Sequence, residues 1–410
     1  TMKITLTQFR PNTAEAVWTD CFAQAIAELH KAGGGVLTVP TGEYSTGPIE
    51  LCSNMELHLE PGEVIRFLND PAAFPLQECQ YEGRISHRPK PCLSAFNAEN
   101  VALTGSGVLD GCGAPWWAAQ RARTLANGRP YLLHFENVTH LRVCGVQLRN
   151  SPAWTVHPLN CVDVLIEDVS ICNPYNSPNT DGINPESCRD VRILNCRVDV
   201  GDDCITLKSG TEETPSPVPC ENIVIANCLL VHGHGGIVIG SEMSGGVRNV
   251  TVTNCVFTGT DRGLRVKTRR RRGGCVENLR LSNLVMERVF CPFVFNMYYS
   301  CGTAEKDRWV WEKTPYPVDG GTPAFRNIRI NGVTVVGATA SAGFFYGLAE
   351  SPIDGLSLTD CHIEMARGAA PEKPAMMGNL EPMSARGFFL RNAKNVEFHN
   401  VTLKKADGEA

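Results

Sequence analysis

The sequence has no long apolar run and little aromatic or basic character. No stretch reaches the ~18 consecutive apolar residues of a transmembrane helix, so no membrane partner is expected. Aromatic residues are only 7% of the chain. The formal net charge is -5, and this acidic charge disfavours a nucleic-acid binder because such proteins lean basic. Hydrophobic residues are 43% against 20% charged ones, and this balance excludes a disordered chain.

The first residues also lack the ~7–15-residue apolar stretch and the small-residue cleavage site of a secretory signal. We therefore expect a cytoplasmic protein, with Met2 as the native start after Thr1. A secreted or periplasmic protein trimmed from a longer precursor is the alternative. The sequence leaves the oligomeric state open.

The chain has 18 cysteines, but they lack the closely spaced C-x-x-C-like pairs of a zinc site. We accordingly expect no metal and no cofactor. Several cysteines occupy the same place in a repeat, directly after Asn or Asp, and such a column favours buried, reduced thiols over disulfide pairs. The cysteines of this column are Cys196, Cys228, Cys255 and Cys361.

Short β-branched runs recur along the chain at a regular interval. The apolar anchors Val164, Val191, Ile223, Val250 and Leu279 are 27, 32, 27 and 29 residues apart, which indicates a solenoid. Its 38 Gly and 26 Pro mark many turns, and no helix-length periodic segment separates the runs. The predicted fold is all-β, a single-stranded right-handed parallel β-helix of about ten coils that forms one domain over residues 1–410.

Three segments depart from the repeat. Residues 19–31 have apolar side chains at helical spacing and end at a Gly-Gly-Gly stop, so we predict a helix that caps the solenoid within an N-terminal region 1–35. The inserts 69–94 and 300–321 are long enough to be functional loops. Their cations and aromatic rings suit sugar stacking and carboxylate binding, with solvated loops as the alternative. These residues are Tyr81, Arg84, His87, Arg88, Lys90, Lys306, Arg308, Trp309, Trp311 and Tyr316.

Four polar motifs fall in four successive coils. Aligned by strand, Ile183, Ile205, Ile237 and Leu264 form one inward column, and stacked strands lie ~4.8 Å apart. Three carboxylates, one imidazole and two cations are therefore expected on one face within a few rungs. The motifs are Asn179-Thr180-Asp181-Gly182, Gly201-Asp202-Asp203, Gly233-His234-Gly235 and Arg265-Val266-Lys267.

Strand alternation adds two expectations. Arg265 and Lys267 are two residues apart and should point outward on the same face. Asp203 would point into the apolar core if its strand were regular, and an unpaired carboxylate there is too costly. The backbone should therefore leave strand geometry at residues 201–203, where Gly201 permits a turn, and likewise at Asp181.

In this order on a β-helix, the four motifs closely resemble those of the family 28 glycoside hydrolases, the polygalacturonase family. The stretch Ser151-Pro152-Ala153-Trp154-Thr155-Val156-His157 is similar to another part of that family, and the resemblance covers roughly residues 14–403. It implies an enzyme that hydrolyses α-1,4-galacturonosyl linkages of pectic oligo- or polysaccharides with inversion.

The resemblance also implies roles for the acidic residues. Asp202 would be the general acid, while Asp181 and Asp203 would position and deprotonate the water. Three close carboxylates repel, so one of their pKa values is expected to rise. His234 would orient or polarise this cluster. Taken singly, each aspartate could instead cap a turn.

Other residues would bind substrate. Arg265 and Lys267 suit a galacturonate carboxylate. Tyr298 is the expected tyrosine on the leaving-group side, with Tyr299 as the alternative. Asn179 and His157 are further candidates, and both could be structural. The run of four arginines at residues 269–272 is expected to face substrate anions or solvent rather than nucleic acid.

The basic and aromatic inserts favour exo action on short oligosaccharides. A rhamnogalacturonan or other decorated-pectin hydrolase of the same family is the first alternative. A β-helical pectate lyase, which would need Ca²⁺ on a carboxylate cluster, is the second. A carbohydrate-binding protein without enzyme activity is the third.

Overall fold

The chain forms two compact units in this computed structural model, which describes residues 2–11, 17–303 and 307–405. The first unit comprises residues 1–81 and 85–202, and the second comprises residues 82–84 and 203–410. Thr1, Lys306 and the last residues of the predicted domain lie outside the described residues. One domain over 1–410 stays a prediction.

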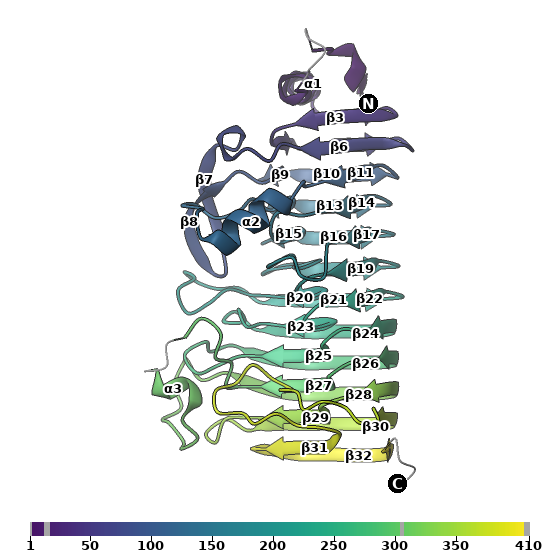
Figure 1. Ribbon diagram of the computed structural model, residues 1–410. Coiled ribbons are helices and arrows are strands. Elements are labelled where there is room, and N and C mark those ends of the chain that lie inside the picture. Colours follow the sequence, from purple (N-terminus) through teal and green to yellow (C-terminus); the bar gives the residue numbers. More distant parts are fainter. Residues whose placement is uncertain (1, 12–16, 304–306, 406–410) are drawn as a thin grey trace. The chain divides into compact units, whose positions relative to one another are not determined.

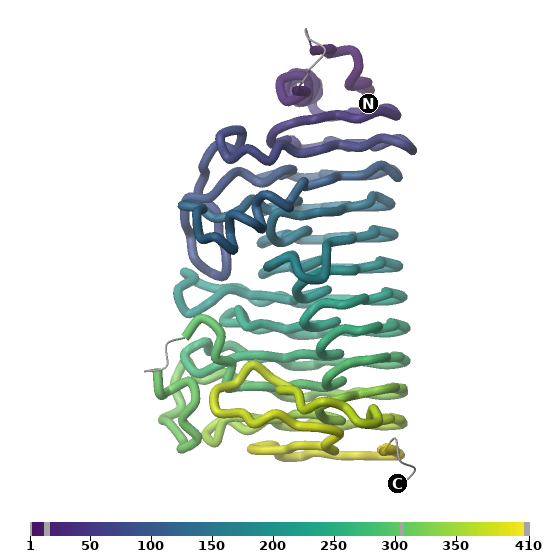
Figure 2. The backbone as a smooth tube through the Cα atoms, viewed as in Figure 1, coloured from purple at the N-terminus to yellow at the C-terminus, as the bar shows by residue number. Residues whose placement is uncertain are grey.

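The first unit is a stack of short parallel strands joined into coils (Figures 1 and 2). Leu57, Leu103, Val143, Ile166 and Ile193 lie in register on successive strands and are buried, so alternate residues of each strand build the core. The strands are β1 (Met2–Thr5), β2 (Gly35–Val39), β3 (Gly42–Thr46), β4 (Ile49–Leu51), β5 (Met55–Leu59), β6 (Glu63–Phe67), β9 (Leu93–Phe96), β10 (Glu99–Gly105), β11 (Val108–Asp110), β12 (Leu133–Glu136), β13 (Thr139–Cys144), β14 (Gln147–Arg149), β15 (Val156–Leu159), β16 (Val162–Glu167), β17 (Ser170–Cys172), β18 (Arg189–Leu194) and β19 (Arg197–Val200).

The predicted capping helix is present as α1 (Thr19–Lys31). Phe22, Ile26 and Leu29 on its inner face are buried, and the helix packs against β1, β2 and β4. Gly33 has φ of 80° and ends the helix, because the left-handed conformation suits glycine. A short 3₁₀ turn, η1 (Leu6–Gln8), precedes it.

Two elements of the first unit were not expected. The segment after β11 contains a helix, α2 (Ala114–Ala122), whose Trp117 donates from Nε1 to the Ser151 carbonyl at 2.9 Å. The insert 69–94 is not an irregular loop. It contains a 3₁₀ turn, η2 (Pro71–Ala73), and a two-stranded sheet of β7 (Leu76–Tyr81) and β8 (Arg84–Pro89).

The second unit repeats the same coil with longer strands. Ile205, Ile237 and Leu264 are in register and buried, which confirms that part of the predicted inward column. The elements are β20 (Ile205–Leu207), β21 (Cys220–Ala226), β22 (Leu229–His232), β23 (Ile237–Ile239), β24 (Val247–Thr258), β25 (Arg262–Lys267), β26 (Cys275–Glu287), β27 (Cys291–Asn296), α3 (Arg308–Trp311), β28 (Ala324–Ala338), β29 (Ser341–Tyr346), β30 (Ile353–Met365), β31 (Arg386–Arg391) and β32 (Ala393–Lys404).

Asparagine ladders cross the long strands of this unit, at positions where the backbone of β24, β26 and β28 has a positive φ. Asn278 donates to Asn249 at 3.0 Å and accepts from Asn327 at 2.7 Å, and all three have positive φ. Asparagine tolerates that conformation and pairs with its neighbours, which explains its recurrence at the anchors. All 18 cysteines lie among the described residues as free thiols, and the four of the predicted column are buried. No helix among the described residues is long and apolar enough to cross a membrane.

Candidate active site

Asp181 lies in an extended segment beside β15 in the first unit. The Thr155 amide donates to the Asp181 carbonyl at 2.9 Å. Asp181 therefore lies at the beginning of a strand-like stretch that continues to Ile183, which pairs with Val156. Asn184 Nδ2 donates to Asp181 Oδ2 at 3.1 Å. Asp181 is buried and stands outside any regular strand, as predicted.

Asp202 lies in the bend that follows β19, so the backbone leaves strand geometry there as expected. The reason for Gly201 differs from the prediction, since its φ is not positive. A Cβ atom at Gly201 would lie 2.4 Å from the Ser177 carbonyl oxygen and 2.7 Å from that of Pro174. Glycine is therefore required by close packing, and the bend rests directly on the loop before Asp181.

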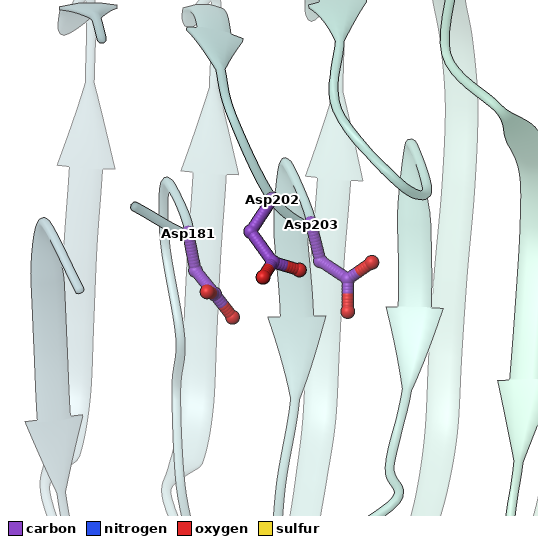
Figure 3. A group of neighbouring side chains, drawn as sticks. All are labelled: Asp181, Asp202 and Asp203. Carbon is purple, nitrogen blue, oxygen red and sulfur yellow. The ribbon is translucent and has the colours of Figure 1, made fainter. Parts of the chain in front are cut away.

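Asp181 and Asp202 approach each other in the first unit (Figure 3). A carboxylate oxygen of each lies within 4.8 Å of the other. Two oxygens within this spacing can both bind one water, or a divalent cation with oxygen ligands. Asp203 follows Asp202 directly in the chain and is the first residue of the longer segment of the second unit.

Asn179 is positioned by a residue that sequence reasoning missed. The Arg129 guanidinium is buried and donates to Asn179 Oδ1 at 2.7 Å. It also donates to the carbonyls of Pro152 at 2.9 Å and Pro178 at 2.5 Å. The only sequence signal was an arginine between a glycine and a proline, and nothing there indicates its contact with Asn179, which lies 50 residues later.

Asp203 forms a buried ion-pair cluster in the second unit. Arg265 Nη1 donates to Asp203 Oδ1 at 2.9 Å, and Lys267 Nζ donates to Oδ2 at 2.7 Å. The exposed fractions are 1% for Asp203, 3% for Arg265 and 7% for Lys267. The two cations share one face of β25, as alternation predicted, but that face is covered rather than open to solvent.

These contacts set the charge of one of the three carboxylates. Burial by itself raises the pKa of Asp203, but Lys267 and Arg265 outweigh burial and bring the pKa well below its ordinary value. Asp203 is therefore a carboxylate and is unsuited to donate a proton. The two cations that were predicted to bind substrate also keep Asp203 ionised.

Two segments cover the face of β25. Arg265 Nη2 lies 3.1 Å from the sulfur of Met376, and Arg262 donates to the carbonyls of Lys373 and Pro374 at 3.0 Å. The ring of Tyr299 lies 5.2 Å from Lys267 Nζ. Residues 373–376 and Tyr299 thereby shield the cations from much of the solvent.

The two candidate tyrosines lie beside different cations. Tyr299 is the one beside Lys267 and Arg265, at 5.2 and 5.9 Å from its ring centre. Tyr298 points to the other side of the chain, where Lys313 Nζ lies 3.4 Å above its ring. Consecutive residues face opposite ways, so Tyr299, which was the alternative expected from the sequence, is the tyrosine beside the two cations of β25. The role on the leaving-group side stays a prediction.

His234 lies in the turn between β22 and β23, and its side chain is 52% exposed. Its Nδ1 atom is 2.8 Å from Oδ2 of Asp261, which sequence reasoning did not single out. The flanking Gly235 packs closely, because a Cβ atom there would lie 2.5 Å from Val238 and 3.2 Å from Asp203 Oδ1.

His157 is not available to substrate. It is fully buried on β15, with Nε2 at 3.0 Å from Glu186 and Nδ1 at 3.1 Å from His134 on the adjacent strand. Gln80 of the β7–β8 insert donates to the same glutamate at 2.6 Å. His157 thus belongs to a structural network that secures the insert, and the structural interpretation replaces the substrate-binding one.

The arginine run at residues 269–272 is mostly buried, which contradicts the solvated loop, one of the two expected alternatives. Arg270 pairs with Glu350 at 2.5 Å and donates to the carbonyls of Trp309 and Glu312 at 2.8 Å. It thereby anchors the described part of the insert 300–321. Arg269 and Arg272 both pair with Glu212, and Arg271 is exposed.

A coiled stack of parallel strands with adjacent carboxylates is the architecture of a carbohydrate-active β-helix protein. The family model of glycosyl hydrolases family 28 matches residues 37–367. The chain belongs to glycosyl hydrolase family 28 and is a glycosidase with the predicted right-handed parallel β-helix.

Named relatives agree with this. A probable polygalacturonase of Vitis vinifera is 30% identical over 363 residues, which span 86% of this chain and 72% of the relative. An exopolygalacturonase of Platanus acerifolia is 26% identical over 336 residues, 78% of this chain and 82% of the relative. The crystal structure of a hyperthermoactive exopolygalacturonase from Thermotoga maritima matches with a TM-score of 0.80 at 30% identity, covering 98% of this chain and 92% of that one.

Proposed function

We propose that this glycosidase hydrolyses α-1,4 linkages between galacturonic acid units of pectic chains and acts from chain ends. The observation that carries the proposal is the pair of neighbouring carboxylates, Asp181 and Asp202, in a family 28 chain. The names of the relatives, polygalacturonase and exopolygalacturonase, support the substrate class and the exo action.

The charges of the site support a division of roles. Hydrolysis with inversion needs one protonated carboxyl at the leaving oxygen and one carboxylate that activates water. Asp203 is ionised by its two cations, so it suits the water-activating role and not the acid role. We therefore assign the general acid to Asp202, with Asp181 beside it sharing the water.

The cations have a second proposed role. Lys267 carries a point charge with three N–H donors, and Arg265 carries a planar fork of donors. Both can also bind a galacturonate carboxylate while they stabilise Asp203. Tyr299 and Asn179 are each proposed to contact substrate, and His234 is proposed to act on the acid.

A product analysis tests this proposal. The wild type should release monogalacturonate or a single short product from polygalacturonate, with inverted anomeric configuration. Random mid-chain cuts would contradict exo action. Asp202→Asn should lose nearly all turnover, whereas the matched control Asp199→Asn, which removes a surface partner of Arg197, should retain it. Full activity of Asp202→Asn would overturn the mechanism.

The same assay separates the alternatives. A pectate lyase would lose activity in EDTA and yield an unsaturated product that absorbs ultraviolet light. A rhamnogalacturonan hydrolase would act on that polymer and leave oligogalacturonides intact. A binding protein would retain oligosaccharides without any turnover.

We also propose that the enzyme works in a reducing compartment such as the cytoplasm, on short imported fragments. The eighteen free thiols support this, because so many cysteines without disulfides are typical of reduced proteins. Fractionation of the source cells would test it, and recovery of the protein outside the cell would contradict it.

A further inference from the structure

His234 and Asp261 lie in equivalent turns of adjacent coils in the second unit. His234 follows β22, and Asp261 follows β24 and directly precedes β25. The His234 Nδ1 and Asp261 Oδ2 atoms are 2.8 Å apart. The imidazole is half-exposed, so burial does not define its orientation, and this contact with a neighbouring coil does.

Asp261 is itself fixed by the backbone of both neighbouring coils. Its amide donates to the Gly233 carbonyl at 2.9 Å, and its carbonyl accepts from the Phe290 amide at 2.8 Å. Arg262 Nη1 lies 3.3 Å from the same Oδ2 atom that contacts His234. The carboxylate therefore sits in one place next to the turn that contains His234.

The chemistry of this contact determines which nitrogen of His234 carries the hydrogen. A carboxylate only accepts hydrogen bonds, so Nδ1 must be the donor in both the neutral and the charged imidazole. Nε2 is then the nitrogen that gains or loses a proton. A neighbouring negative charge also favours the imidazolium form.

We propose that Asp261 is a positioning residue that orients His234 with Nδ1 protonated and Nε2 as its acting atom. The proposal rests on the proposed function, in which His234 acts on the carboxyl cluster. The charged and titratable groups near the pair are Arg262, which contacts Asp261, and Arg265, Asp203 and Cys291, which act electrostatically on Arg262.

Two variants separate orientation from charge. Asp261→Asn retains an acceptor oxygen for Nδ1 but loses the charge, and Asp261→Ala loses both. We expect Asp261→Ala to lower kcat on oligogalacturonides about tenfold, while KM stays within about twofold of the wild-type value. We expect Asp261→Asn to lower kcat by a smaller factor. In both variants the titration of His234 should move to lower pH. It is followed by NMR, and the His234 signal is assigned as the one that is missing from the spectrum of His234→Ala.

Asp163 provides a matched control in the first unit. It accepts from His140 Nδ1 at 2.7 Å and from Arg192 at 2.7 Å, which reproduces the same histidine and arginine contacts on the surface. Asp163→Asn should leave kcat and its pH profile unchanged.

The results distinguish this inference from the function on which it rests. Wild-type kcat and an unmoved His234 titration in both Asp261 variants would overturn the positioning role, as would full activity of His234→Ala. If wild type does not cleave galacturonides, the proposed function fails, while the NMR titration still decides whether Asp261 controls the protonation of His234.

Discussion

Replacing Asp203 with asparagine should destabilise the protein strongly even though the side chain keeps its shape. Asp203 accepts from Arg265 at 2.9 Å and from Lys267 at 2.7 Å, and all three side chains are less than one-tenth exposed. Asp203→Asn leaves two buried cations without their counter-charge. Removing one partner of a buried pair costs about 3–5 kcal/mol, and we expect the free energy of unfolding to fall by that amount at pH 7.

The loss of stability in Asp203→Asn should depend on pH, and the pKa of Asp203 determines in which direction. The pKa of Asp203 is lower in the folded than in the unfolded chain, where an aspartate has a pKa of about 3.9. Its contribution is therefore complete above that value and declines as the pH falls toward the folded pKa. The difference between wild type and Asp203→Asn should be constant from pH 7 to about 5 and shrink below about 4.

Urea denaturation followed by tryptophan fluorescence at pH 7, 5 and 3.5 would measure these free energies. The control is Asp163→Asn, whose partner Arg192 is exposed, and such a surface pair is worth about 0–1 kcal/mol. Equal losses in the two variants, or a loss in Asp203→Asn that does not change with pH, would refute the reasoning from buried charge.

Three further predictions concern other parts of the chain. In native protein a thiol reagent should modify Cys172 and Cys301 rapidly, because these two of the 18 cysteines are exposed. Denaturation should make all 18 thiols reactive, and a lower number in denatured, unreduced protein would indicate disulfides. Asn278→Ala should cost about 1–3 kcal/mol in urea denaturation, since alanine strains at φ of 57° and ends the amide ladder, and Asn278→Gly should cost less. Arg129→Met should lower kcat on oligogalacturonides about tenfold by releasing Asn179, and unchanged kinetics would remove Asn179 from the site.

Local patterns in the sequence were sufficient for much of the fold. The helix over residues 19–31 has exactly the bounds of α1, because amphipathic spacing and a glycine stop are both local signals. The register of Ile205, Ile237 and Leu264 followed from aligning repeats. Helix α2 was not predicted, because only the adjacent residues Trp116 and Trp117 of this helix are buried and they do not form a helical periodic pattern.

The choice between neighbouring or equivalent residues needed the tertiary structure. Alternation put Arg265 and Lys267 on one face, but only the packed chain shows that residues 373–376 and Tyr299 cover that face. His157 resembled a substrate ligand in its motif and proved to lie among His134 and Glu186.

The sequence by itself determined the solenoid, the order of the four motifs and the family, because a repeat and its spacing are properties of neighbouring residues. The tertiary structure alone decided the partners of the charged groups: Asp203 with Arg265 and Lys267, and His234 with Asp261. Those pairs join residues 27 to 64 positions apart, and the protonation of each group depends on the partner that packing brings to it.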